Sequence, residues 1–314
     1  MALLLHLADV NEHAWAERFR SALGNYPVLL RSDSYDPDDI RYIFAWKPSD
    51  DAFDGFNHLK AVLSLGAGVD ALLQHPRLPE GVPIVRFVDD ELTQCMSDYV
   101  IASVTMHQRL FSRYAAHQKA RIWSQLYPPP ATAISVGIMG MGQLGVDAAR
   151  KLVMLGFKVN GWSRTEKHVD GVTRYAGDET FDAFLGATDI LVNLLPLTAD
   201  TRGILNYATF KKLRRGTLIG GPVVVNAARG GHQKEADIIK ALEDGTLSAA
   251  SLDVFETEPL PKDSPLWTLE NCFVTPHIAA ISSERNGARY FSQMLLDHEA
   301  GKPLRNVVDR ERGY

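Results

Sequence analysis

A glycine-rich loop near the middle of the chain constrains the fold more than any other feature. It comes directly after the apolar run 133–136 and contains Gly140, Gly142 and Gly145 in the spacing G-x-G-x-x-G. The first glycine of such a loop permits a tight turn, the second lets a pyrophosphate approach the backbone, and the third lets helix and strand pack closely. The loop therefore predicts a dinucleotide site that begins well inside the chain.

The residues around the loop support this interpretation. Residues 143–155 have the periodicity of a helix, and Gly156 is placed to stop it. A helix that opens at the loop presents free N–H groups and a partial positive charge to phosphates. Because a strand pattern precedes the loop, and a helix and a second strand follow it, cofactor binding is favoured over a purely structural turn.

Length and composition bound the rest of the molecule. The chain has 314 residues, which is more than one core usually serves, so a second domain is expected in front of the loop. The formal net charge of −5 argues against nucleic acid or an anionic membrane as a partner. No run approaches a membrane span, and residues 2–5 fit a first strand better than a signal peptide, so the cytoplasm is the expected location.

The two cysteines do not suggest a metal site. Cys95 and Cys272 have no spacing suited to metal ligation, and both lie among apolar residues. We expect buried free thiols and no bound metal.

Apolar runs in the first ninety residues alternate with helical patterns. Residues 11–23 read as an amphipathic helix, with Asn11 as its cap and Gly24 as its stop. This alternation predicts a parallel sheet covered on both faces. The expected strands are 3–7, 28–30, 40–46, 61–65 and 84–88.

A long helix is expected next, and the alternation then resumes. Residues 93–118 contain no glycine or proline and place apolar residues on one helical face. Pro128, Pro129 and Pro130 interrupt the chain before the glycine loop. Beyond the loop, the last helical pattern is 283–300, ending at Gly301. The expected strands there are 158–162, 190–195, 223–227, 250–255 and 273–275.

The end of the strand after the loop distinguishes the two nicotinamide cofactors. An acidic residue is expected about 20 residues beyond the loop when the ribose is unphosphorylated. This chain has Ser163, Arg164 and Thr165 there, with Lys167 close behind and no carboxylate. A guanidinium suits a phosphate, so NADP(H) is preferred and NAD(H) remains possible. The structural alternative is a solvated basic turn without a ligand.

Titratable residues follow three successive strand patterns further on. Arg229 follows the first, Asp253 and Glu258 the second, and His277 the third. In open α/β sheets ligands bind at that edge. An imidazolium at His277 can protonate a carbonyl oxygen that receives a hydride, Glu258 can favour the charged imidazole, and Arg229 can bind a carboxylate in a fork.

Each of these residues also has a structural interpretation. Taken singly, His277 is more often structural, Arg229 can be an ion-pair partner, and Glu258 can be a surface acid. Asp253 can cap a turn. Their joint placement on successive strand ends favours carbonyl reduction beside a carboxylate.

These segments resemble the D-isomer-specific 2-hydroxyacid dehydrogenase family over nearly the whole chain. The resemblance includes the run 64–70 in the first domain and the closing residues 312–314. Within the family, the chain most resembles the bacterial glyoxylate/hydroxypyruvate reductase A group. The segments behind that narrower resemblance are 44–46, 161–164, 194–197 and 263–267.

The resemblance implies roles for individual residues. Arg229 would bind the substrate's carboxylate and carbonyl, and Glu258 would support His277 as the acid–base group. Ala67 and Gly68 would hold the substrate carboxylate through the backbone, and Trp46 would wall the pocket or be a buried core aromatic. The residues implied at the cofactor are Gly140, Met141, Gly142, Gln143, Leu144, Gly145, Ser163, Arg164, Thr165, Pro196, Thr201, Ala227, Arg229 and Asp253.

One segment departs from the family pattern. The chain between Gly216 and Asn226 is several residues longer than is usual in the family. Because proline cannot sit in a central strand, Pro222 predicts that the strand begins at Val223 and that 217–221 form an added turn.

The expected fold is α/β, with two doubly wound parallel-sheet domains and a cleft between them. A flavodoxin-like substrate domain would comprise 1–95 and 285–314, and a Rossmann cofactor domain 96–284. The family implies a homodimer built largely around the cofactor domains and the NADPH-dependent reduction of glyoxylate or hydroxypyruvate to glycolate or glycerate. Two alternatives are an NAD-dependent dehydrogenase of a bulkier D-2-hydroxy acid and a non-catalytic dinucleotide-sensing protein.

Overall fold

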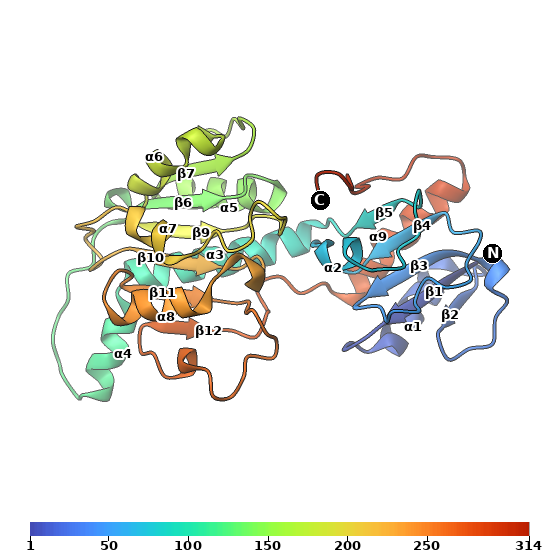
Figure 1. The fold of residues 1–314 in the computed structure, drawn as a ribbon, viewed down its shortest axis with the longest axis horizontal. Helices are drawn as coiled ribbons and strands as arrows, with labels where there is room; N and C mark the ends of the chain where they lie inside the picture. The colour runs from blue at the N-terminus through green and yellow to red at the C-terminus, as the bar shows by residue number, and fades with distance from the viewer. Residues whose placement is uncertain (314) are drawn as a thin grey trace. The chain divides into compact units, whose positions relative to one another are not determined.

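The computed structural model describes residues 1–313, and their contacts divide them into two compact units. Unit 1 consists of residues 1–92 together with the segment from Ile281 onward, and unit 2 is the continuous segment Thr93–Ala280. The C-terminal helix α9 (Glu284–Glu299) thus belongs to the same unit as the N-terminal strands (Figure 1).

Unit 1 is a five-stranded parallel sheet in the order β2-β1-β3-β4-β5, the order of flavodoxin-like folds. Its strands are β1 (Ala2–Leu7), β2 (Val28–Leu30), β3 (Ile40–Trp46), β4 (Ala61–Ser64) and β5 (Ile84–Arg86). Besides α9, its helices are α1 (Glu12–Leu23), a 3-10 turn at Pro37–Asp39, and α2 (Asp70–Leu73). The five expected strands are therefore present, two of them with shorter ends.

Aromatic packing explains why α9 joins the N-terminal elements. Phe44 of β3 lies 5.0 Å from Trp15 of α1 and 5.2 Å from Phe291 of α9, measured between ring centroids. Gly287 lets α9 approach, since a Cβ there would lie 2.5 Å from the Trp15 ring. The expected cap of α1 is also present, because the Asn11 side chain accepts a hydrogen bond from Ala14 N at 3.1 Å.

Unit 2 is a seven-stranded parallel sheet in the order β12-β11-β10-β9-β6-β7-β8. The chain runs outward from β6 in both directions, so the switch point of this Rossmann-type order lies between β6 and β9. The strands are β6 (Ser135–Met139), β7 (Lys158–Ser163), β8 (Val172–Ala176), β9 (Ile190–Asn193), β10 (Val223–Asn226), β11 (Ala249–Leu252) and β12 (Cys272–Val274). The expectation of two doubly wound parallel sheets is confirmed.

Helices cover both faces of this sheet. Buried residues of α3 (Asp90–Gln108) and α5 (Gln143–Met154) share one apolar core with β6. Residues from α6 (Phe181–Gly186), α7 (Tyr207–Lys212) and α8 (Glu235–Glu243) form the core on the other face. The central strands β6, β9, β10 and β11 are buried along their length, which explains their continuous apolar runs. Short 3-10 turns complete the unit at Ala131–Ala133, Asp178–Thr180, Gly230–His232 and Pro265–Trp267.

The expectation of one long helix over 93–118 is wrong. Helix α3 ends at Gln108, and a second helix, α4 (Phe111–Lys119), follows it. The break is at Leu110, which has a left-handed φ of 61° and is buried in the core of unit 2. Burial of this side chain outweighs the strain of its backbone, and no glycine or proline signals the break in the sequence.

The added turn before β10 has the expected form. Strand β10 begins at Val223, directly after Pro222. Gly220 and Gly221 have φ angles of 95° and 147°, which side chains rarely adopt, and the Ser248 hydroxyl donates to the Gly221 carbonyl at 2.8 Å. The edge strand β8 was not expected, because none of its residues is fully buried and it has no apolar run.

The cysteines differ from expectation in one respect. Cys95 and Cys272 are free thiols as expected, but each is only partly buried, so the expectation that they are buried is wrong. Cys272 begins the edge strand β12, and burial raises the pKa of its thiol to about 12. Within residues 1–313, no group of three or more His, Cys, Asp or Glu side chains could hold a metal ion. No helix in that part of the chain is long and apolar enough to span a membrane.

Candidate active site

The glycine loop joins β6 to α5 at the switch point of the unit 2 sheet. Gly140 has a φ of 98°, and a Cβ there would lie 2.6 Å from the Leu194 carbonyl oxygen. A Cβ on Gly145 would lie 2.0 Å from the Gly140 carbonyl oxygen. A side chain at either position would push the helix or the next strand away, so these two glycines are required by packing.

Gly142 differs from Gly140 and Gly145 because the space that a side chain would take there is open. It is the N-cap of α5 without a side-chain cap, and a Cβ there would have no atom within 4 Å. The first N–H groups of a helix have no partner within the helix, so this end of α5 can accept the phosphates of a dinucleotide. Gln143 and Leu144 lie in that first turn, whereas the Met141 side chain is buried against Gly161.

No carboxylate stands at the end of β7. The Ser163 hydroxyl donates to the Thr165 carbonyl at 2.8 Å, and Arg164 between them is exposed. The nearest acid along the chain, Glu166, is paired with Arg174 at 2.7 Å. An exposed guanidinium in this turn is suited to a phosphate group.

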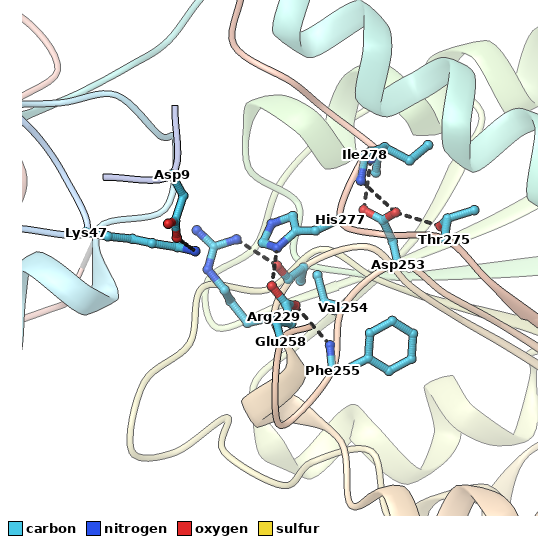
Figure 2. A network of polar contacts seen from close by, with 12 residues as sticks. Asp9, Lys47, Arg229, Asp253, Val254, Phe255, Glu258, Thr275, His277 and Ile278 are labelled. Atoms are coloured by element: carbon cyan, nitrogen blue, oxygen red, sulfur yellow. Dashed lines mark hydrogen bonds and ion pairs between the residues drawn. The ribbon is translucent and has the colours of Figure 1, made fainter. Parts of the chain in front are cut away.

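Three titratable side chains meet beyond the ends of β10, β11 and β12, as Figure 2 shows: Arg229, Glu258 and His277. The Arg229 backbone is extended, and its Nη1 donates to the Ala228 carbonyl at 2.8 Å. Gly230 follows it, and a Cβ there would lie 1.7 Å from the Phe255 carbonyl oxygen. This close approach fixes the Arg229 segment against the segment that leads to Glu258.

Glu258 and His277 form a direct pair. Nδ1 of His277 lies 2.8 Å from Oε2 of Glu258, and the two side chains are 39% and 33% exposed. The other oxygen, Oε1, accepts from Phe255 N at 3.0 Å. Burial opposes ionisation of Glu258, but the hydrogen bonds from His277 and Phe255 and the charges of His277 and Arg229 together lower the pKa of its carboxyl. A carboxylate here orients the ring and leaves Nε2 for another partner.

Asp253 holds the backbone that carries His277. Its carbonyl accepts from His277 N at 2.8 Å, and its carboxylate accepts from Ile278 N at 2.9 Å and Ala279 N at 2.8 Å. The Asp253 side chain is buried. The turn-capping role that was the structural alternative for Asp253 is therefore present.

Thr201 organises the loop that follows β9. Its hydroxyl donates to the Pro196 carbonyl at 2.8 Å and accepts from Thr198 N at 2.9 Å. Ala227, directly after β10, is buried. The Thr201 side chain thus fixes the backbone of the loop after β9.

Sequence reasoning missed a buried amide network behind Arg229. Asn193 and Asn226 are register partners at the ends of β9 and β10, and Asn193 Nδ2 donates to Asn226 Oδ1 at 3.0 Å. Asn226 Nδ2 donates to the Arg229 carbonyl at 3.1 Å and to Gln233 Oε1 at 2.8 Å. Gln233 Nε2 in turn donates to the Val254 carbonyl at 2.9 Å. An asparagine that ends each of two apolar strands was the available signal.

His232 adds a further tie to this network. It is fully buried, with Nδ1 3.1 Å from the Arg229 carbonyl and Nε2 3.2 Å from the Pro196 carbonyl. The loops after β9 and β10 are thereby joined through one ring.

The other expected substrate residues lie in unit 1, at the ends of β3 and β4. Trp46 ends β3, and its ring covers Gly66, where a Cβ would lie 2.6 Å from a ring carbon. Ala67 and Gly68 follow and are partly exposed. Trp46 is partly exposed too, so the structure does not make it a fully buried core aromatic.

An open glycine loop at the switch point of a Rossmann sheet, with a His–Glu pair and an arginine at neighbouring strand ends, defines a nucleotide-linked oxidoreductase. Comparison with protein-family models supports this class. Residues 101–279 match the model for the NAD binding domain of D-isomer specific 2-hydroxyacid dehydrogenases. The chain belongs to this family, as its motifs predicted.

Relatives over the full length belong to the expected group. The glyoxylate/hydroxypyruvate reductase A of Serratia proteamaculans is 40% identical over 307 residues, which cover 95% of this chain and 96% of that protein. The NADPH-dependent glyoxylate/hydroxypyruvate reductase of Sinorhizobium meliloti, solved with NADP and sulfate, is 44% identical with a TM-score of 0.95 over the whole of both chains. A probable 2-hydroxyacid dehydrogenase of Rhizobium etli, solved with NADP, HEPES and tartaric acid, is 43% identical with a TM-score of 0.94, covering 100% of this chain and 99% of that one.

Proposed function

We propose that this protein reduces a small 2-oxo acid with NADPH, converting glyoxylate to glycolate and hydroxypyruvate to D-glycerate. The observation that carries the proposal is the pairing of His277 with Glu258 at 2.8 Å, beside Arg229. The names of the relatives agree with it, since the Serratia and Sinorhizobium proteins are glyoxylate/hydroxypyruvate reductases. A tartaric acid bound to the Rhizobium protein supports a small acid as the ligand class.

The proposed chemistry is proton transfer and charge stabilisation by three side chains. The nicotinamide supplies the hydride when the cofactor is bound. His277 donates a proton from Nε2 to the carbonyl oxygen, since Nδ1 is occupied by Glu258. Glu258 stabilises the charged ring, and Arg229 binds the substrate carboxylate and polarises the carbonyl.

We assign the cofactor to unit 2 and the first contacts with the substrate carboxylate to unit 1. The free first turn of α5 at Gly142 fits the pyrophosphate, and Arg164 fits a 2′-phosphate, which favours NADPH over NADH. In unit 1, the backbone of Ala67 and Gly68 would hold the carboxylate beside Trp46. The remaining assigned cofactor contacts are Gly140, Met141, Gln143, Leu144, Gly145, Ser163, Thr165, Pro196, Thr201, Ala227, Arg229 and Asp253.

The proposed location is the cytoplasm, and the proposed assembly is a homodimer. Exposed apolar side chains in the segment after α4 support the dimer: Ile122, Trp123 and Tyr127 are 52%, 104% and 84% exposed. Side chains of this size left in water are typical of a protein interface.

Initial rates with glyoxylate and hydroxypyruvate, each with NADPH and NADH, test the function. We expect turnover of both acids and a higher kcat/KM with NADPH. Preference for NADH together with a bulkier 2-oxo acid would favour the alternative dehydrogenase. Binding of either cofactor without oxidation by any 2-oxo acid would favour a dinucleotide-sensing protein and overturn the enzyme mechanism.

A further inference from the structure

A chain of hydroxyl groups connects helix α3 to the loop that carries His277. The Tyr99 hydroxyl of α3 lies 2.9 Å from Thr275 Oγ1, directly after β12. Thr275 Oγ1 lies 2.6 Å from Asp253 Oδ1, directly after β11. The three residues belong to unit 2 and come from three different elements.

The hydrogen-bond chemistry fixes the direction of this chain. A carboxylate only accepts hydrogen bonds, so the single hydroxyl proton of Thr275 goes to Asp253. Thr275 Oγ1 must then accept from Tyr99, which has to keep its proton. Burial raises the pKa of the Tyr99 phenol to about 12, so it remains a donor at neutral pH.

The Asp253 carboxylate connects Thr275 to the backbone of the loop that carries His277. It accepts from Thr275 Oγ1 and Ile278 N (Figure 2). It also accepts from Ala279 N, and the Asp253 carbonyl accepts from His277 N. These bonds surround a residue in a left-handed conformation, since His277 has a φ of 56°. Non-glycine residues rarely adopt that conformation, so the surrounding bonds must hold it.

The Thr275 bond sets the orientation of the carboxylate. Oδ1 serves both Thr275 Oγ1 and Ile278 N, whereas Oδ2 serves Ala279 N. The plane of the carboxylate therefore depends on the Thr275 hydroxyl as well as on the backbone N–H groups of Ile278 and Ala279. Asp253 is 1% exposed, so water has little access to replace a missing donor.

We propose that Thr275 and Tyr99 are positioning residues for the reduction: they orient Asp253, which fixes the backbone of 277–279 and aims the His277 ring at Glu258. This inference rests on the proposed role of His277 as the acid. Neither Thr275 nor Tyr99 needs to touch substrate or cofactor for it to hold. Both residues act on the site only through Asp253.

A matched pair of variants at Thr275 tests the inference. Thr275→Val keeps the shape and removes the hydroxyl, whereas Thr275→Ser keeps the hydroxyl and removes a methyl group. We expect Thr275→Val to lower kcat about 10- to 100-fold, because small displacements of a catalytic group have effects of that size. We expect Thr275→Ser to keep most of kcat, and neither variant to change the dissociation constant of NADPH by more than about twofold.

Two further measurements separate positioning from general packing. The ring signals of His277 in ¹H–¹⁵N spectra should shift in Thr275→Val and stay in place in Thr275→Ser. Tyr99→Phe should lower kcat by less than Thr275→Val does. The double variant should resemble Thr275→Val alone, since both residues act through one chain.

Some outcomes would overturn the inference. Wild-type kcat in Thr275→Val, or equal losses in Thr275→Val and Thr275→Ser, would show that the hydroxyl does not position His277. His277→Ala, assayed in parallel, distinguishes this from failure of the proposed function. If His277→Ala is inactive while Thr275→Val is unaffected, only the positioning inference fails; if His277→Ala keeps turnover, both fail.

Discussion

At the scale of single residues, Arg164 carries the proposed choice of cofactor. It is exposed at the end of β7 in a turn that has hydroxyls on either side and no carboxylate at the strand end. A guanidinium there can form a forked pair with a 2′-phosphate, and an aspartate can instead accept from an unphosphorylated ribose.

Arg164→Asp should therefore weaken NADPH much more than NADH. Charge-assisted pairs of this kind contribute roughly 1.5–3 kcal/mol, so we expect a loss of about 10- to 100-fold in NADPH affinity. Fluorescence titration with both cofactors measures it, and Arg174→Asp on the neighbouring strand β8 is the control. Equal losses for NADPH and NADH in Arg164→Asp would remove Arg164 from the phosphate site.

Glu258 makes the stability of unit 2 depend on pH in a defined direction. Its hydrogen bonds lower the pKa of the carboxyl below the ordinary 4.5, against the effect of burial. The unfolded chain then binds the proton more readily, so the contribution of Glu258 to stability is present above 4.5 and is lost as the pH falls through the lower, folded value.

Glu258→Gln measures this contribution, since glutamine resembles the protonated acid. At neutral pH we expect the variant to lower the free energy of unfolding by roughly 0.5–1 kcal/mol, because the pair is partly exposed. The difference from the wild type should shrink as the solution is acidified through the carboxyl range. Denaturant unfolding across that range checks the sign, and a difference that stays constant or grows would contradict it.

The residue types of the candidate site could be predicted from the sequence, but the hydrogen bonds that connect them could not. Strand ends followed by charged residues identified Arg229, Glu258 and His277, which Figure 2 shows as one group. The bonds from Asp253 to 277–279 depend on how two loops from different strands pack, and no local pattern encodes them. For the network through Asn226 and Gln233, the asparagines at the strand ends were a signal, but their partners depend on the same loop packing.

At the scale of elements, the loop between β6 and α5 separates two kinds of glycine. A Cβ on Gly145 would collide with the Gly140 carbonyl, whereas a Cβ on Gly142 would meet no protein atom within 4 Å. Gly145 is thus needed for packing. The space at Gly142 is available to a ligand.

Alanine substitutions should separate these roles. Gly145→Ala should destabilise unit 2 by about 1–3 kcal/mol, since the helix must shift away from the loop. Gly142→Ala should change stability by only a few tenths of a kcal/mol but weaken NADPH binding at least about tenfold, because its methyl group takes the space of the pyrophosphate. Thermal unfolding and cofactor titration of both variants provide the check; unchanged NADPH affinity in Gly142→Ala would contradict the assignment.

Strong periodic patterns predicted elements well, and special backbone geometry escaped prediction. The buried strands were evident because apolar runs without polar interruption suit a sheet covered on both faces. The break between α3 and α4 was not evident, because Leu110 adopts a left-handed conformation that the neighbouring residues do not predict. Strand β8 lies at the sheet edge and mixes polar and apolar side chains without a continuous apolar run, so its pattern resembles a loop.

At the scale of the whole molecule, helix α9 makes the first unit discontinuous. It packs on α1 through Gly287 and Trp15, and the connection back to the first unit falls between Ala280 and Ile281. The local sequence pattern could identify this helix but not the unit against which it packs. The family resemblance supplied that expectation.

The exposed aromatic segment after α4 gives a prediction about assembly. Trp123 is 104% exposed, and buried tryptophans at interfaces commonly contribute 2 kcal/mol or more. Trp123→Ser should therefore raise the dimer dissociation constant at least about tenfold, as measured by analytical ultracentrifugation. Leu296→Ser, which changes an exposed apolar side chain of α9, should leave the dimer intact. A wild type that sediments as a monomer would contradict the proposed assembly.

The most direct test of the whole account is the rate of NADPH oxidation by glyoxylate in the wild type and in His277→Ala, with the NADPH dissociation constant measured on the same samples. We predict that the variant binds NADPH as the wild type does and loses about 10²- to 10⁴-fold in kcat, the usual contribution of a positioned acid. Comparable turnover in both proteins would contradict the assignment of His277 and the mechanism built on its pair with Glu258.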